Sequence, residues 1–352
     1  MAKNMEIRKF SSINLDDTFF DSLKNDYPGF ADWYERKSNA GEEAFVQYDD
    51  KEHLQGFLYL KDESGKVDKD ISPLMEPKRR LKVGTFKIEA HNTRLGEKFI
   101  KKIMDRAIYD GFEEAYVTIF PKHERLMDML RKYGFEDYGT KGEEKVLVKT
   151  FSKYTGDLLY DYPLILPEHK RKFLLSIYPK FHTPLFSDSI LKNEERNVDD
   201  LVKDVSFSNS IHKVYICFMP KTANLRKGDL LAIYRTNDGM GTARFRSVVT
   251  SICQVEEVKT KDAFSSVDDY LDYCKSYSIF TEGDLRKWFL NDNLVVIKMT
   301  YNIALAKRIT RGMLLDEAKI SSTIYWGFFQ LTDDQFDYIL KKGNVNENFI
   351  VN

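Results

Sequence analysis

The chain has 352 residues, which is long enough for two or three domains with hydrophobic cores of their own. Its 42% hydrophobic and 31% charged residues are ordinary for a globular protein. Because 54 Lys and Arg nearly balance 55 Asp and Glu, no overall field attracts a polyanion, and any nucleic-acid surface has to be a local patch.

The first 151 residues alternate strand and helix patterns in an order that predicts a mixed sheet with flanking helices. Strands are expected at 5–10, 44–48, 55–60, 80–89, 115–120 and 145–151. Helices are expected at 15–24, 30–37, 95–109 and 123–132. The Tyr27-Pro28-Gly29 break separates the first two helices. The helix at 95–109 places Phe99, Ile103 and Ala107 on one face, as an amphipathic helix does when it packs on a sheet.

A second, mainly β domain is expected beyond a linker at 152–176, where Pro163, Pro167 and a basic run at 169–172 interrupt any regular pattern. Its strands are expected at 214–219, 230–234, 243–258 and 294–300, and its helices at 267–275 and 282–290. In the tail, a strand leads into a helix that Thr332 is expected to cap. The expected fold class is α/β (α+β), with one domain over 1–151 and another over 177–352.

The most informative stretch runs from Arg80 to Phe135. A strand there enters a turn of small and polar residues and then a helix, so backbone N–H groups and the positive end of the helix dipole point at one spot. Such a turn is a ready site for a pyrophosphate, and Gly96 in the first helical turn allows close backbone approach. The next strand and helix end in Tyr133-Gly134-Phe135, a turn into a further strand.

This arrangement resembles the GNAT superfamily of N-acetyltransferases, whose first motif is (R/Q)xxGx(G/A) between a strand and a helix. The segment His91-Asn92-Thr93-Arg94-Leu95-Gly96 stands in that frame, and its glycine matches the last small position. His91 replaces the usual Arg or Gln, and Arg94 replaces the first glycine and is expected to contact a phosphate of CoA. The YGF turn matches the second family signature. The resemblance implies a GNAT domain over 1–151, with a mixed central sheet, that uses acetyl-CoA to acetylate an amine.

Most of the residues that the resemblance assigns to acetyl-CoA lie at the end of the long strand, in the turn after it and in the first turn of the next helix. In the family, a backbone N–H holds the thioester carbonyl where the long strand bulges, which by position lies near 86–88. The expected cofactor-binding residues are Phe86, Lys87, Ile88, His91, Asn92, Thr93, Arg94, Leu95, Gly96, Glu97 and His123.

Acyl transfer from a thioester to an amine needs a polarised carbonyl, a neutral amine and a proton for the leaving thiolate. Glu89, at the end of the long strand, is expected to act as the general base. His123 is expected either to contact the cofactor or to relay a proton. The usual tyrosine acid of the family falls on Leu130, a departure that leaves Tyr133 as the nearest phenol. Each of these residues also has an interpretation without a catalytic role. Glu89 would be a solvated carboxylate, His123 a solvated histidine at a helix start, and Tyr133 a packed aromatic ring.

The second domain resembles the PUA-like group of small β-barrels, which includes ASCH and EVE domains. The resemblance rests on 224–229, a turn before a strand, and on 325–332, a strand before the last helix. It implies a β-barrel with helices that binds RNA or modified nucleotides. The residues expected to contact RNA are Arg235, Lys307, Arg308 and Arg311, with solvated surface charge as the alternative.

Three functions remain open from the sequence. The first is acetylation of an amine on RNA, charged tRNA or a ribosome-associated substrate that the PUA-like domain presents. The second is acetylation of a small amine or protein, with the C-terminal domain as a regulatory or binding module. The third is binding without catalysis. The spacing of Cys217, Cys253 and Cys274 argues against a disulfide framework or a metal cluster, and the lack of a run of about 20 apolar residues favours a cytoplasmic protein.

Overall fold

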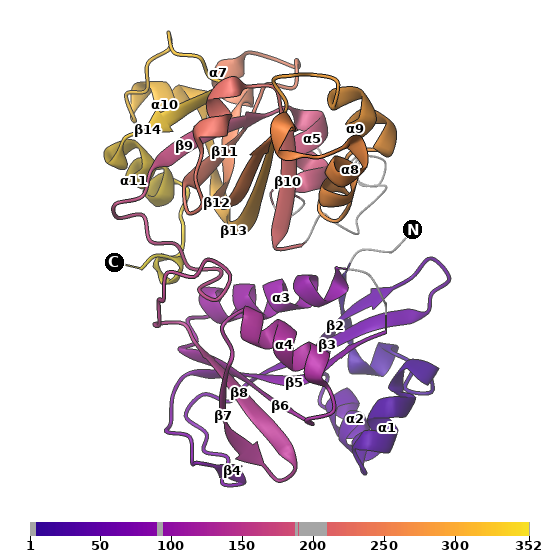
Figure 1. Ribbon diagram of the computed structural model, residues 1–352. Coiled ribbons are helices and arrows are strands. Elements are labelled where there is room, and N and C mark those ends of the chain that lie inside the picture. The colour runs from indigo at the N-terminus through magenta and orange to yellow at the C-terminus, as the bar shows by residue number, and fades with distance from the viewer. Residues whose placement is uncertain (1–4, 90–93, 187–188, 190–209, 352) are drawn as a thin grey trace. The chain divides into compact units, whose positions relative to one another are not determined.

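The computed structural model describes residues 5–89, 94–186, 189 and 210–351, and Figure 1 shows it as a ribbon. The chain divides into two compact units, Met1–Lys153 and Tyr154–Asn352. The stretch expected to be a linker, 152–176, falls mostly inside the second unit. Its last residues already belong to strand β9 (Lys172–Ile177), which pairs with a neighbour and is therefore part of a sheet.

The first unit contains an eight-stranded mixed sheet in the order β1-β2-β3-β5-β6-β8-β7-β4. Its strands are β1 (Glu6–Lys9), β2 (Glu43–Tyr48), β3 (Leu54–Asp62), β4 (Ile71–Ser72), β5 (Arg80–Ile88), β6 (Glu114–Ile119), β7 (Glu136–Lys141) and β8 (Glu144–Thr150). The central pair β5 and β6 is parallel, and the other pairings of the described strands are antiparallel.

Four helices accompany the sheet in the described part of the first unit (Figure 1). They are α1 (Asp21–Asp26), α2 (Phe30–Asn39), α3 (Leu95–Tyr109) and α4 (Glu124–Lys132), with short 3-10 turns η1 (Phe10–Ser12) and η2 (Thr18–Phe20). The predicted inner face of α3 is confirmed, because Phe99, Ile103 and Ala107 are fully buried. A cluster of aromatic rings holds α2 against the sheet, with Tyr34 of α2 and Phe57 of β3 at 6.5 Å between centroids.

The parallel pair β5 and β6 separates part-way along its length. The two strands pair from Arg80 to Val83 and from Glu114 to Val117, and the register continues no further. On its other side, β5 remains paired with β3 to its end, with a register shift that leaves Gly84 as the extra residue of a β-bulge. Beyond Gly84, one edge of β5 therefore turns away from β6.

The second unit contains a six-stranded mixed sheet in the order β10-β13-β12-β11-β9-β14. Besides β9, its strands are β10 (His212–Cys217), β11 (Leu230–Arg235), β12 (Val248–Thr260), β13 (Val295–Thr310) and β14 (Phe328–Leu331). Among the described residues, the edge strands β10 and β14 do not pair with each other, so the sheet is open and the expected closed barrel is not formed. The alternating sequence pattern predicts strands, but it does not determine whether the edges of a sheet meet.

Short helices surround the second sheet. They are α5 (Pro179–Leu185), α7 (Ala243–Arg246), α8 (Val267–Lys275), α9 (Glu282–Trp288), α10 (Arg311–Asp316) and α11 (Asp333–Lys342), with 3-10 turns η5 (Pro220–Asn224), η6 (Lys261–Ala263) and η7 (Glu347–Phe349). The strand expected from residue 243 begins only at Val248, because residues 243–246 form the short helix α7. The predicted cap at Thr332 is confirmed as a capping box with Gln335. Among the helices that the structure describes, none has the length and apolar character needed to cross a bilayer.

Candidate active site

A cavity of about 1030 Å³ lies in the first unit where β5 and β6 separate. Its sheet wall consists of residues 83–88 of β5 and 117–119 of β6, the stretches at and beyond the end of their pairing. The facing wall comes from α1, α2 and the turn between them, and α4 and the start of α3 complete the lining. The bulge at Gly84 and the divergence of the two strands thus create the space.

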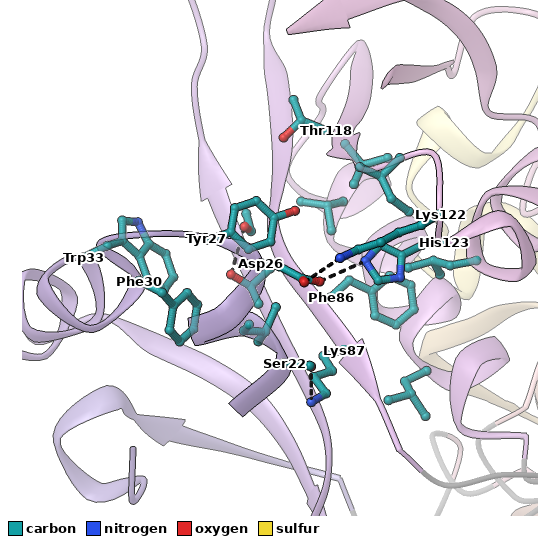
Figure 2. Close-up of a pocket in the computed structure, with 18 of the residues that line it drawn as sticks. Ser22, Asp26, Tyr27, Phe30, Trp33, Phe86, Lys87, Thr118, Lys122 and His123 are labelled. Atoms are coloured by element: carbon teal, nitrogen blue, oxygen red, sulfur yellow. Dashed lines mark hydrogen bonds and ion pairs between the residues drawn. The ribbon is translucent and has the colours of Figure 1, made fainter. Parts of the chain in front are cut away.

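A carboxylate and two basic groups meet inside this cavity (Figure 2). Asp26, at the end of α1, binds Lys122 Nζ through Oδ1 at 2.5 Å, and its Oδ2 lies 3.5 Å from His123 Nε2. The Asp26 side chain is 17% exposed and that of His123 is 42% exposed. His123 is the N-cap of α4, and its backbone N–H donates to the Phe120 carbonyl at 3.0 Å. The imidazole is therefore accessible, while its backbone is fixed.

Lys87 joins the two walls of the cavity. Its Nζ donates to Ser22 Oγ at 2.7 Å and to the backbone carbonyl of Phe19, and it pairs with Glu89 Oε1 at 2.9 Å. Lys87 lines the cavity, but these contacts engage its ammonium group with protein atoms. Its role in the structure is to tie β5 to the segment that leads into α1.

Aromatic rings form much of the helix wall (Figure 2). Tyr27, Phe30 and Trp33 line the cavity from α2 and the turn before it. Tyr27 packs on Phe120 at 5.0 Å between centroids, and its hydroxyl donates to Glu144 Oε1 at 2.9 Å. Burial raises the pKa of Tyr27, and the neighbouring Glu144 carboxylate raises it further, so this phenol keeps its proton at neutral pH.

Two further cations line the cavity. The guanidinium groups of Arg36, in the last turn of α2, and Arg125, in the first turn of α4, make no hydrogen bond or ion pair within the described part of the chain. Together with Lys87 and Lys122, these arginines give the lining four cationic side chains against two carboxylates, Asp26 and Glu124. The cavity is therefore positive, as expected of a site for anionic ligands.

The start of α3 reaches the same cavity through Gly96. A Cβ at this position would lie 2.7 Å from Met129 Sδ, so the glycine allows α3 to approach α4 closely. Arg94 is the N-cap of α3 and lies 3.9 Å from Glu97 Oε1 through Nη1. Leu95 and Glu97 are buried, and neither lines the cavity. His91, Asn92 and Thr93 lie outside the described residues.

The expected catalytic residues do not come together. His123 lines the cavity, whereas Glu89 is exposed at the end of β5 and does not. Tyr133 is fully buried after α4 and also stays outside the lining, so its hydroxyl is not placed to protonate a leaving group there. The thioester position expected near Phe86 to Ile88 lies in the sheet wall, with the bulge itself at Gly84.

Sequence reasoning missed Asp26, Lys122 and Trp33. The signal available was the Tyr27-Pro28-Gly29 break, which marks the turn that carries Asp26 into the cavity. Gly29 has a φ of 85°, a left-handed conformation that ends this turn and begins α2. The contact of Asp26 with Lys122 and His123 depends on two segments far apart in the sequence, so no local pattern indicates it.

The residues expected to contact RNA occupy different environments in the second unit. Lys307 is exposed. Arg308 turns inward and donates to the Leu305 carbonyl, and the guanidinium of Arg311 covers the Trp326 ring at 4.5 Å. Arg235 is only 1% exposed, because every residue of β11 is buried, so it does not lie on the surface where RNA contacts were expected.

No protein-family model matches the chain, and no curated protein matches it. Solved structures that resemble parts of it include ASCH from Zymomonas mobilis, at 10% identity and a TM-score of 0.33, over 48% of this chain and 94% of that chain. The N-acetyltransferase PseH from Campylobacter jejuni in complex with acetyl coenzyme A is 10% identical, with a TM-score of 0.30, over 42% of this chain and 99% of that chain. A GNAT-family acetyltransferase from Listeria monocytogenes is 14% identical, with a TM-score of 0.30, over 42% and 94%.

The structural neighbours thus include GNAT acetyltransferases and an ASCH protein, each over about half of this chain. Identities of 10–14% and TM-scores of 0.30–0.33 do not establish an activity. An activity has to be argued from the cavity of the first unit and its residues.

Proposed function

We propose that the chain is an acetyl-CoA-dependent N-acetyltransferase and that the cavity of the first unit is its active site. The observation that carries this proposal is the separation of β5 from β6 beyond Val83 and Val117. The separation leaves a strand edge inside a cavity of about 1030 Å³ that also holds a carboxylate–histidine pair. A free strand edge binds amide groups, and the carboxylate–histidine pair moves protons.

The cavity suits both parts of acetyl-CoA. The pantetheine arm carries amide groups, which the backbone edge at 84–88 would hold as a neighbouring strand does. The pyrophosphate would be held by backbone N–H groups at the first turn of α3, where Gly96 lines the cavity, with Arg125 as a nearby counter-charge. When bound, acetyl-CoA supplies the activated acetyl group.

His123 is the group best placed to accept the proton that the amine loses. Asp26 Oδ2 lies 3.5 Å from Nε2, so the carboxylate stabilises the positive charge that the imidazole gains with the proton. The amine nitrogen bonds to the acetyl carbon, the C–S bond breaks, and the sulfur leaves as a thiolate that takes a proton from water. Since a cysteine thiol has a pKa of only about 8.5, a thiolate of this kind can leave without a dedicated acid.

The test compares His123→Ala and Asp26→Asn with a matched pair outside the cavity. His53 and Asp49 form an ion pair at 3.3 Å on the surface, so His53→Ala and Asp49→Asn are equivalent changes without a proposed role. Loss of a general base is expected to lower turnover about 10²- to 10⁴-fold while the affinity for CoA is retained. The measurements are CoA release from acetyl-CoA with a panel of amines and calorimetric CoA binding. Full turnover in His123→Ala would refute the assignment of the base, and absence of acetyl-CoA binding at millimolar concentration would refute the proposed function.

For the second unit, we propose an RNA ligand, which would allow the acceptor amine to be carried by an RNA or an RNA-bound substrate. The support is an exposed ring beside a stacked pair: Tyr325 is 67% exposed and adjoins Trp326, which Arg311 covers. Exposed aromatic rings next to arginine suit base stacking.

Binding of single-stranded RNA to the full chain is expected to weaken with rising salt and to weaken about tenfold in Tyr325→Ala. The matched control is Tyr109→Ala on α3, which changes a 50% exposed tyrosine of the first unit. Absence of salt-dependent RNA binding would overturn the RNA proposal and favour the alternative, a small-amine or protein acetyltransferase with a regulatory C-terminal module.

A further inference from the structure

The face of α2 that lines the cavity is built in two parts. Phe30, Trp33 and Arg36 all belong to the lining, and their spacing of three residues places them along one stripe of the helix. The first part of the stripe is apolar and aromatic, and its last member is a cation. A ligand that lies along this stripe therefore meets a ring surface first and a guanidinium group afterwards.

The two ends of the stripe lie at different distances from the proposed reaction centre. The N-terminal end of α2 follows directly on Asp26, which contacts Lys122 and His123, and on Tyr27, which packs on Phe120. Because an α-helix rises about 1.5 Å per residue, Arg36 is roughly 9 Å further along the helix than Phe30. Figure 2 shows Phe30 and Trp33 on one side of the view and Lys122 and His123 on the other, with Asp26 and Tyr27 between them.

Arg36 is available to a ligand. Its guanidinium has no hydrogen bond or ion pair among the residues that the structure describes, whereas Lys87 and Lys122 are engaged with protein atoms. A planar guanidinium binds carboxylates and phosphates through two parallel hydrogen bonds, which makes it selective for an anionic group. Trp33 is half-buried and packs on Phe30 at 5.3 Å between centroids, so it offers a fixed apolar surface beside that cation.

We infer that the acceptor is an amine with an aromatic or apolar body and, at the end away from the amine, an anionic group that Arg36 binds. This inference rests on the proposed acetyltransferase function and adds the class of acceptor. The amine lies toward His123, the body lies against Phe30 and Trp33, and the anion reaches the C-terminal turn of α2. Arg125 lies on α4, on the opposite wall, and remains available for the phosphates of CoA.

The test uses three amines that differ only at the far end of one aromatic ring: tyramine, 4-(2-aminoethyl)benzoate and tyramine O-phosphate. With saturating acetyl-CoA, the two anionic amines are expected to exceed tyramine in kcat/KM by about tenfold to a hundredfold, as a charge-assisted hydrogen bond supplies. The better of the two identifies the anion as a carboxylate or a phosphate. Equal kcat/KM for all three amines would overturn the inference.

Variants of Arg36 connect the preference to this residue. Arg36→Gln is expected to remove the advantage of the anionic amines over tyramine, and Arg36→Lys is expected to retain part of that advantage. Arg106→Gln is the matched control, because Arg106 is an exposed arginine of α3 that pairs with Asp110 and does not line the cavity. Circular dichroism checks that each variant is folded. An undiminished preference in folded Arg36→Gln would overturn the inference.

Calorimetry separates this inference from the proposed function. If wild-type protein binds 4-(2-aminoethyl)benzoate and Arg36→Gln does not, the anion site stands even where no CoA is released, and the acetyltransferase proposal alone fails. If CoA is released from amines without regard to charge, the acetyltransferase proposal stands and the anion site fails.

Discussion

The bulge at Gly84 should be the most sensitive point of the active-site scaffold. Gly84 is the extra residue at the register shift between β5 and β3, directly after the last pair of β5 with β6. A Cβ at this position would lie 2.7 Å from Tyr59 Cδ1 and 3.1 Å from Tyr59 Cε1. Gly84→Ala is therefore a one-atom change that requires either the strand or the ring to move.

The ring of Tyr59 has little freedom to give way. Tyr59 is 1% exposed, its hydroxyl accepts from Lys37 Nζ at 2.8 Å, and its ring makes an edge contact with Phe10 at 5.2 Å between centroids. Insertion of an extra methyl group into a packed core costs about 1–3 kcal/mol. Because β5 is the strand that would move, we also expect a loss of activity, and a shift of about 1 Å in a reacting group can cost roughly a hundredfold in rate.

A double-mutant cycle measures this effect. The free energy of unfolding and kcat/KM for acetyl-CoA are compared for wild type, Gly84→Ala, Tyr59→Leu and the double variant. If the contact with Tyr59 is the cause, the alanine should cost about 1–3 kcal/mol with tyrosine present and much less with leucine. Equal costs in both backgrounds would refute the reasoning.

Two predictions concern buried ionisable groups. Burial raises the pKa of Glu114, but hydrogen bonds from Lys78 and Arg80 outweigh it and hold that pKa below its ordinary value. The stabilisation is thus present above about pH 4.3 and is lost as pH falls through the lower folded pKa. Glu114→Gln should therefore lower the free energy of unfolding by about 3–5 kcal/mol at neutral pH and by progressively less in acid. A loss of stability that does not depend on pH would contradict this. Burial, followed by the charges of Arg235 and Arg308, lowers the pKa of His182 to about 3. Protonation of His182 in the unfolded state should therefore cost the second unit about 1.4 kcal/mol of stability for each pH unit between about 6.5 and about 3, and His182→Asn should remove this contribution. The measurement is urea unfolding followed by tryptophan fluorescence in a Trp33→Phe background, where the remaining tryptophans, Trp288 and Trp326, both lie in the second unit. If the dependence of stability on pH is the same in His182→Asn, His182 is not its source.

Periodicity predicted best the elements of the first unit that bury an apolar face, whereas the helix expected at 15–24 begins only at Asp21 as α1, which has no buried residue. The helix expected at 95–109 is α3 with the same bounds, and the strand expected at 80–89 is β5, which ends at Ile88. The strand β7 (Glu136–Lys141) was not predicted. Four of its six residues are exposed and none is buried, so its sequence carries no alternation of apolar and polar residues.

The candidate site was only partly predictable, because it depends on contacts between distant segments. The position of His123 followed from the order of elements, but its partner Asp26 lies at the end of another helix. For Arg235, charge alone indicated a surface residue, whereas both faces of β11 are covered in the structure. A charged residue predicts a solvated position only when the strand that carries it has a solvated face.

The division of the cavity into a strand wall and a helix wall has a consequence for the order of the reaction. The chain has three cysteines, Cys217, Cys253 and Cys274, and all three are buried in the second unit, so no cysteine of the first unit can take the acetyl group from CoA in a covalent intermediate. In the proposed arrangement, the donor lies against the edge of β5 and the acceptor against α2, so the two would be bound at the same time. Initial-rate plots at several fixed amine concentrations should therefore intersect rather than run parallel.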